Sequence, residues 1–331
     1  MASATRLDPA THAPYSLAIV ATAFVYHPQF LEHQTGWKHP ENRRRLTAIL
    51  ERLEAAGLLP RLLRLEPQEA PLAAITRIHD PAYVDALAAQ CARGELFSPD
   101  ADTVASPGTY RAAVLAAGAA LTAVDAVMDG RVANAFCAVR PPGHHAERNQ
   151  AMGFCFFNNV AIGVRYAQER HGLSRIAVID WDVHHGNGTE HAFAEDASVF
   201  YVSLHQFPLY PGSGRRSDRG RGAGAGYTLN IPLAQGSTLT DYLHAFRDDI
   251  HPAMAAFKPE FVFVSAGFDA HRSDPLAAMD LTEEGFAALT DEVLGMARSY
   301  AQGRLVSVLE GGYHLTALAA SVEAHLRRLM A

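Results

Sequence analysis

Short apolar runs rich in β-branched and aromatic residues alternate with helical patterns along most of the chain, and this alternation restricts the fold more than any other feature. We predict strands at residues 17–24, 135–139, 176–179, 199–204, 227–231, 261–265 and 305–309. Several runs are apolar on both faces, which is typical of strands in a parallel sheet covered by helices. Helices are predicted at about residues 39–57, 109–128, 158–169, 239–256 and 282–301. The pattern indicates one α/β domain around a mostly parallel sheet.

Composition narrows the classes of function. The chain has 331 residues and a formal net charge of −7, and a mildly acidic chain without a basic stripe argues against nucleic acid as a direct ligand. Three scattered cysteines are too few for a disulfide framework or a cysteine-based zinc site. Residues 1–15, expected to be flexible, lack the apolar core of a signal peptide, and we see no apolar run long enough to span a membrane. The expected location is therefore the cytoplasm, and a homo-oligomer stays open.

Titratable side chains follow four of the predicted strands at the point where each strand ends. In chain order these are His144 and His145, then Asp180, Asp182 and His184, then Asp269, and finally Tyr313. In an open α/β sheet, ligands bind beyond the carboxyl ends of the strands. Because these titratable side chains all follow strand ends, we predict that they form a single site.

The spacing of Asp180, Asp182 and His184 predicts a metal site. In an extended chain, side chains at i, i+2 and i+4 point the same way, so two of them can bind one ion, with Asp269 as the best third ligand. Two carboxylates and one imidazole suit Zn²⁺ with an open coordination position, although Fe²⁺, Co²⁺ and Mn²⁺ stay open. The alternative is that the aspartates cap helices and the histidines are ordinary core residues. Convergence of four strand ends disfavours it.

The remaining strand-end residues suit hydrolysis. His144 and His145 can supply a base and an acid near neutral pH, and Tyr313 can donate its hydroxyl to a developing oxyanion. The alternatives are a simple Pro-Gly turn for the histidines and packing for the tyrosine. The segment GRGAGA at 220–225 formally fits a dinucleotide motif but leads into a predicted strand, which makes such a site a poor interpretation.

Seven segments resemble the zinc-dependent histone deacetylase family: RPPGHHA, GFCFFNN, DWDVHHGNGT, VSLH, YPGSG, SAGFDAHRSDPL and LEGGY. The chain is most similar to the class II branch and to bacterial histone-deacetylase-like amidohydrolases, from about residue 26 to residue 327. The resemblance implies an arginase/deacetylase fold in which residues 1–331 form one domain with a parallel sheet of about eight strands.

By resemblance, the zinc ligands are Asp182, His184 and Asp269, His144 and His145 are the tandem catalytic pair, and Tyr313 stabilises the oxyanion. The resemblance also implies two structural potassium sites. The first is formed by Asp180, which also orients His144, together with Ser203 and main-chain oxygens of Asp182, His184 and Leu204. The second, matched less closely, is formed by Phe193, Val199 and Tyr227.

Other matched positions concern the substrate. Gly153, Phe154 and Tyr210 would line a narrow acyl-lysine tunnel. Leu276 occupies the rim position where polyamine-selective members tend to carry an acidic residue. Asn187 stands where class I members carry an aspartate that orients the second histidine, and it should leave His145 less able to hold a proton. Arg45 matches an arginine near the internal region through which acetate leaves.

We therefore expect a zinc-dependent amidohydrolase that removes acetyl or related acyl groups from acyl-lysine in proteins or peptides. The alternative within the enzyme class is a deacylase of acetylpolyamines or other small amides. A non-catalytic acyl-lysine or metal-binding module is disfavoured, because binding alone does not need the histidine pair and Tyr313. A binuclear manganese enzyme of the arginase type shares the fold, but the sequence offers only one full ligand set.

Overall fold

Eight parallel strands form one sheet in the computed structural model, which describes residues 20–331. The order across the sheet is β2-β1-β3-β8-β7-β4-β5-β6, and every neighbouring pair is parallel. The strands are β1 (Val20–Val25), β2 (Leu63–Leu65), β3 (Val132–Cys137), β4 (Ile176–Asp180), β5 (Val199–Gln206), β6 (Thr228–Leu233), β7 (Phe261–Ala266) and β8 (Leu305–Leu309). The predicted fold class is confirmed. The predicted strand residues 17–19 and the segment 1–15 lie outside the described residues.

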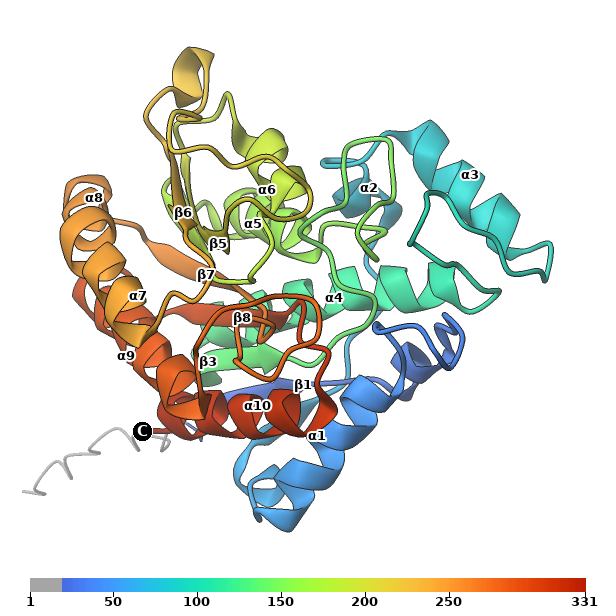
Figure 1. The fold of residues 1–331 in the computed structure, drawn as a ribbon. Coiled ribbons are helices and arrows are strands. Elements are labelled where there is room, and N and C mark those ends of the chain that lie inside the picture. The colour runs from blue at the N-terminus through green and yellow to red at the C-terminus, as the bar shows by residue number, and fades with distance from the viewer. Residues whose placement is uncertain (1–19) are drawn as a thin grey trace, which may run out of the picture.

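Helices cover both faces of the sheet (Figure 1). They are α1 (Arg44–Ala55), α2 (Leu72–Ile75), α3 (Pro81–Cys91), α4 (Thr109–Met128), α5 (Asn159–His171), α6 (Asn187–Phe193), α7 (Leu239–Ala245), α8 (His251–Phe257), α9 (Glu283–Tyr300) and α10 (Leu315–Leu329). Two side chains of β3 show the layers. Asn134 donates to the carbonyl of Leu329 in α10, whereas Cys137, on the opposite face, contacts the carbonyl of Ala119 in α4. Helix α5 packs on α4, and α1 and α9 pack on α10.

The sequence analysis predicts no segment that is apolar and long enough to span a membrane. This prediction is wrong for one helix among residues 20–331. Helix α4 has 20 residues and a mean hydropathy of 1.5 over its window, which meets that test by length and composition. However, 78% of the window is buried inside the protein, where α4 lies between α5 and strands β1, β3 and β8. A helix enclosed by other elements needs an apolar surface on every side.

Two predicted helices differ from the observed ones. The predicted helix at 239–256 is interrupted by a π-helical turn, Phe246–Ile250, between α7 and α8. Pro252 follows in the first turn of α8, where it has no N–H for an α-helical hydrogen bond, and the wider turn accommodates this loss. The predicted helix at 39–57 begins later, at Arg44, because the side chain of Asn42 accepts the Arg44 amide and closes a turn before the helix.

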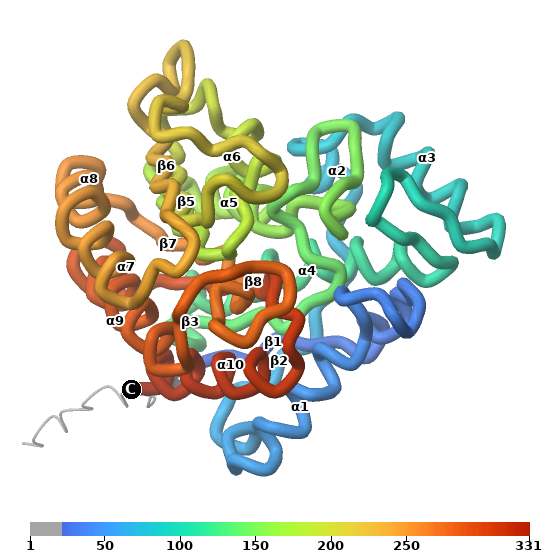
Figure 2. Tube along the Cα trace, viewed as in Figure 1, coloured from blue at the N-terminus to red at the C-terminus, as the bar shows by residue number. Residues whose placement is uncertain are grey.

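The order of the strands places the carboxyl ends of β3, β8, β7 and β4 side by side. Each is followed by a segment that carries candidate site residues. The segment after β3, residues 138–158, is long and has no helix or strand of its own, and its path can be followed in Figure 2. The sheet therefore brings together residues that are far apart in the sequence.

Candidate active site

Three buried side chains from neighbouring strand ends meet in a metal trio (Asp182, His184 and Asp269). The Nδ1 atom of His184 lies 3.1 Å from Asp182 Oδ1 and 3.2 Å from Asp269 Oδ2. One ligand atom from each residue lies within 4.8 Å of the others. Burial and the neighbouring Asp182 charge raise the pKa of Asp269 to about 7, so two buried carboxylates here call for a cation between them. This donor set fits Zn²⁺ with an open coordination position.

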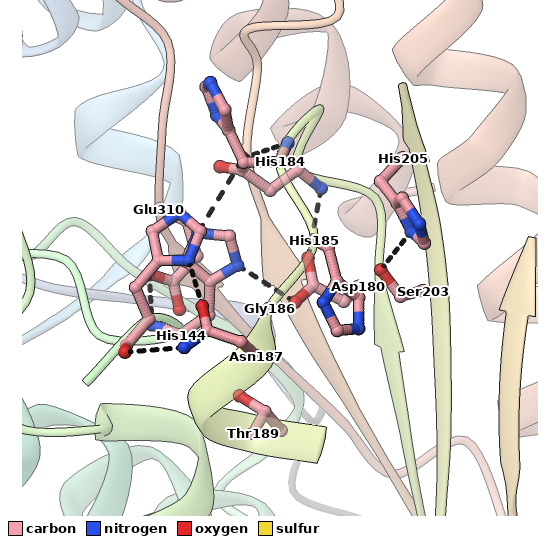
Figure 3. A network of polar contacts seen from close by, with 12 residues as sticks. His144, Asp180, His184, His185, Gly186, Asn187, Thr189, Ser203, His205 and Glu310 are labelled. Atoms are coloured by element: carbon pink, nitrogen blue, oxygen red, sulfur yellow. Dashed lines mark hydrogen bonds and ion pairs between the residues drawn. The ribbon is translucent and has the colours of Figure 1, made fainter. Parts of the chain in front are cut away.

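Asp180 does not join the metal trio, and the expectation that it points the same way as Asp182 and His184 is wrong. The chain bends directly after β4 instead of staying extended. The bend arises because Asp180 Oδ1 accepts the amide of Asp182 at 3.1 Å and Asp182 Oδ1 accepts the amide of His184 at 2.9 Å. The other oxygen of Asp180 faces the Nδ1 atom of His144 at 3.1 Å (Figure 3).

The two neighbouring histidines have different partners. His144 contacts the Asp180 carboxylate, and its Nε2 lies 3.7 Å from Asp182 Oδ1. Burial alone would lower the pKa of His144, but the charges of Asp182 and Asp180 outweigh it and raise the pKa to about 10. The Nδ1 atom of His145 instead lies 2.8 Å from the amide oxygen of Asn187. Burial, followed by the positive charges of His144 and His184, holds the pKa of His145 well below its usual value.

Gly153 allows the chain to pass directly over the His145 ring. A Cβ atom at this position would lie 2.4 Å from His145 Cδ2, and the backbone φ is +55°. Only glycine meets both conditions without strain. The next residue, Phe154, has its amide held by the hydroxyl of Thr103 at 3.0 Å. The predicted wall of the tunnel is therefore fixed next to the histidine pair.

Aromatic rings surround the same point. The Tyr210 ring stands edge-on to His145 at 5.2 Å and to His184 at 6.2 Å between centroids. Phe154 stands edge-on to Tyr313 at 5.8 Å. Tyr210 is 37% exposed, so its side chain lies between the buried histidines and the surface. Its place in a substrate tunnel stays a prediction.

Tyr313 and Leu276 are held by one carboxylate that the sequence analysis missed. Asp274 Oδ2 accepts the backbone amide of Tyr313 at 2.7 Å, and Asp274 Oδ1 accepts the amide of Leu276 at 3.0 Å. Burial, with the charges of Asp269 and Asp182, raises the pKa of the Tyr313 phenol well above its usual value. The hydroxyl therefore keeps its proton at neutral pH and can donate it in a hydrogen bond.

Glu310 is a second buried carboxylate that the sequence analysis missed. Its Oε2 atom accepts the amides of Gly143 at 2.7 Å and His144 at 3.1 Å, which fixes the backbone of the histidine pair. Arg45 holds the segment that carries Glu310, donating to the carbonyls of Glu310 at 2.5 Å and Gly312 at 2.7 Å. The only sequence signals for these roles are Glu310 in LEGGY and Asp274 in SDP. Acidic loop residues are usually solvated, so neither motif alone indicates a buried carboxylate.

Arg45 also lies beneath Tyr313, with its guanidinium carbon 5.1 Å from the ring centroid. Arg45 and Arg140 share one buried carboxylate, Glu41, which accepts from Arg140 at 2.5 and 2.7 Å and from Arg45 at 3.2 Å. All three side chains are fully buried. The position of Arg45 beside the site agrees with the expectation, while its part in acetate release stays a prediction.

The proposed potassium ligands lie where the strand register places them. Ser203 is the partner of Asp180 across β4 and β5, and its hydroxyl lies 2.9 Å from the Nδ1 atom of His205 (Figure 3). Leu204 is the next residue of β5. The residues of the second site are Phe193 at the end of α6, Val199 at the start of β5 and Tyr227 directly before β6. Both potassium sites stay predictions.

Comparison with known proteins decides the family. Residues 39–329 match the model of the histone deacetylase domain. The chain belongs to the histone deacetylase family. It is 40% identical over 296 residues to a probable deacetylase of Archaeoglobus fulgidus, covering 89% of this chain and 82% of that protein. It is 40% identical over 301 residues to the histone deacetylase-like amidohydrolase of Pseudomonas aeruginosa, covering 91% and 77%.

Two further relatives bear on fold and substrate. The human polyamine deacetylase HDAC10 is 44% identical over 319 residues, which cover 92% of this chain and 47% of that protein. The crystal structure of the HDA15 HD domain matches with a TM-score of 0.89 and 38% identity, covering 94% of this chain and 89% of that one. The resemblance stated from the sequence motifs is thus confirmed, and these relatives carry the names of deacetylases or of deacetylase-like proteins.

Proposed function

We propose that this deacetylase-family protein is a zinc-dependent hydrolase that removes acetyl or closely related acyl groups from acyl-lysine in proteins or peptides. One observation carries the proposal. The metal trio and the histidine pair with its two unlike partners lie together, with His144 Nε2 3.7 Å from Asp182 Oδ1, and Tyr313 follows the neighbouring strand β8. Binding alone needs neither the histidine pair nor the Tyr313 hydroxyl, whereas hydrolysis of an amide uses both.

Asp182, His184 and Asp269 would hold the ion, which when bound supplies a Lewis acid that polarises the amide carbonyl and lowers the pKa of water. The first proposed potassium site, around Asp180 and Ser203 at the ends of β4 and β5, would offer hard oxygen donors. It would stabilise the bend after β4 that orients the metal ligands.

The protein side chains would move the protons. His145 carries its proton on Nδ1, facing Asn187, so its Nε2 atom can accept a proton from water while the water oxygen bonds to the carbonyl carbon. Tyr313 donates a hydrogen bond to the carbonyl oxygen as negative charge develops there. When the C–N bond breaks, a protonated histidine of the pair delivers a proton to the leaving nitrogen, giving a free amine and a carboxylate.

The tunnel favours a long alkyl amine. Phe154 and Tyr210 would offer aromatic contact to the methylene stem of lysine, and Leu276, at the proposed rim, would offer apolar contact without charge. Acetylpolyamines are the second candidate class, because a relative with 44% identity is named a polyamine deacetylase. Leu276 gives a polycation no electrostatic attraction, and this favours acyl-lysine.

A substrate panel tests the proposal. Zinc-loaded enzyme would be assayed for acetate release from acetyl-lysine peptides, acetylspermidine, acetylputrescine and small acetamides, with Asp269→Asn as the control that lacks a ligand. We expect the peptides to give the highest kcat/KM. Higher kcat/KM with acetylpolyamines would support the second candidate, and no hydrolysis of any acyl amide would refute both.

A further inference from the structure

Glu147 lies one side chain beyond the contact between His145 and Asn187. Its Oε1 atom is 2.5 Å from Asn187 Nδ2 and 2.8 Å from His191 Nδ1. Asn187 and His191 belong to α6, while Glu147 follows the histidine pair closely in sequence. A continuous polar chain therefore runs from buried His145 through Asn187 and Glu147 to His191, whose side chain is 56% exposed.

The carboxylate of Glu147 determines which way the amide of Asn187 faces. A carboxylate can only accept hydrogen bonds, so it selects the NH₂ group of Asn187 and leaves the amide oxygen toward His145 Nδ1, 2.8 Å away. The other contacts of that NH₂ group are long, at 3.4 Å to the carbonyl of His145 and 3.5 Å to the sulfur of Met152. Without Glu147, little opposes a reversal of the amide.

Reversal of the Asn187 amide would change the tautomer of His145. An NH₂ group facing Nδ1 requires Nδ1 to accept, and the ring proton of neutral His145 then has to lie on Nε2. That nitrogen is the one from which a base must act. His144 differs, because its Nδ1 faces the carboxylate of Asp180 directly and no amide needs to be oriented.

The charge of Glu147 is present at neutral pH. Burial alone would raise its pKa, but the hydrogen bonds from His191 and Asn187 outweigh burial and lower the pKa below its usual value. The carboxylate side chain is 21% exposed, so its contact with Asn187 is partly shielded from water.

We propose that Glu147 is a positioning residue that acts through Asn187 to keep the proton of His145 on Nδ1 and leave Nε2 free to accept a proton. The inference rests on the proposed function, in which His145 is the base. Asp180 contacts His144 directly, whereas Glu147 would act on His145 through the intervening side chain of Asn187.

The first test compares Glu147→Ala and Glu147→Gln with Glu195→Gln in the zinc-loaded full chain. Glu195 is an exposed glutamate that pairs with Arg221 at 2.8 Å, so its variant removes the same charge away from His145. Loss of such an outer partner typically lowers activity by a factor of about 10 to 100. We expect Glu147→Ala to lower kcat by that factor with KM and zinc content unchanged, and Glu147→Gln to lower it less, because the glutamine carbonyl can still accept from Asn187.

The second test uses the sign of the effect. In Asn187→Asp, a carboxylate replaces the amide that Glu147 now contacts, and the two negative groups repel each other. Adding Glu147→Gln supplies an NH₂ group that can donate to this carboxylate. Glu147→Gln should therefore lower kcat in the parent and raise it in the Asn187→Asp background. An unchanged kcat in Glu147→Ala, or the same direction of effect in both backgrounds, overturns the inference.

A third measurement does not depend on activity. NMR of the histidine ring nitrogens, with His145 assigned by its loss in His145→Ala, reports which nitrogen carries the proton. We expect Nδ1 to be protonated in the parent and a shift toward protonated Nε2 in Glu147→Ala. A parent that hydrolyses no acyl amide refutes the proposed function. His145 still fully protonated on Nδ1 in Glu147→Ala overturns this inference alone.

Discussion

Replacing Tyr313 with phenylalanine removes one hydroxyl and leaves the supports of the ring in place. The ring stands edge-on to Phe154 at 5.8 Å and lies 5.1 Å from the guanidinium of Arg45, and phenylalanine keeps both contacts. The backbone amide is held separately by Asp274 at 2.7 Å. We expect Tyr313→Phe to fold and bind zinc like the parent. Its kcat should nevertheless fall by a factor of about 10² to 10³, or about 2.7–4 kcal/mol, because one oxyanion donor is lost.

The assay is steady-state acetate release from an acetyl-lysine peptide, with zinc content and melting temperature measured on the same sample. Tyr300→Phe is the matched control, because Tyr300 is the last residue of α9 and lies outside the site. The control should keep the kcat of the parent. An unchanged kcat in folded, zinc-loaded Tyr313→Phe would show that the hydroxyl does not stabilise the transition state.

Two further predictions concern specificity and stability. Leu276→Glu should shift the ratio of kcat/KM for acetylspermidine to kcat/KM for an acetyl-lysine peptide by about 10-fold or more toward acetylspermidine, or about 1.4 kcal/mol. A parent enzyme that already prefers acetylspermidine would contradict this reasoning. Glu41→Gln should lower the free energy of unfolding by about 3–5 kcal/mol, because Arg140 and Arg45 lose their buried counter-charge. Urea titrations measure this difference, and a loss as small as that of a surface ion pair would contradict the prediction. Burial alone would raise the pKa of Glu41, but Arg140 and His33 hold it well below 4.5. The difference between parent and variant should therefore be full above about pH 4.5 and shrink as the pH falls below it, and a constant difference refutes this assignment.

The sheet was predictable where strands are buried on both faces. Strands β4 and β7 are buried throughout, and such strands appear in the sequence as continuous apolar runs. Strand β2 was missed because Leu63–Leu65 has only three residues and is partly exposed, which is too short for any periodicity. The eight-stranded sheet was expected only from the resemblance.

The site was predictable in part for a related reason. In a parallel sheet, residues that follow different strands share one edge, so Asp182, Asp269 and Tyr313 could be placed together without knowing the strand order. The direction of Asp180 could not be predicted, because hydrogen bonds between side chains and backbone amides bend the chain after β4. Glu147 was missed because its partner Asn187 lies 40 positions away, and the local sequence cannot distinguish it from a solvated loop residue.

Zinc titration of the metal-free enzyme tests the central claim most directly. Bound zinc, released acetate and free amine would be measured together with an acetyl-lysine peptide as substrate. Since residues 20–331 offer one such trio, acetate and amine should appear in equal amounts, and the rate should rise until about one equivalent of zinc is bound. Full activity in the presence of chelator, or a requirement for two tightly bound ions per chain, would contradict the account.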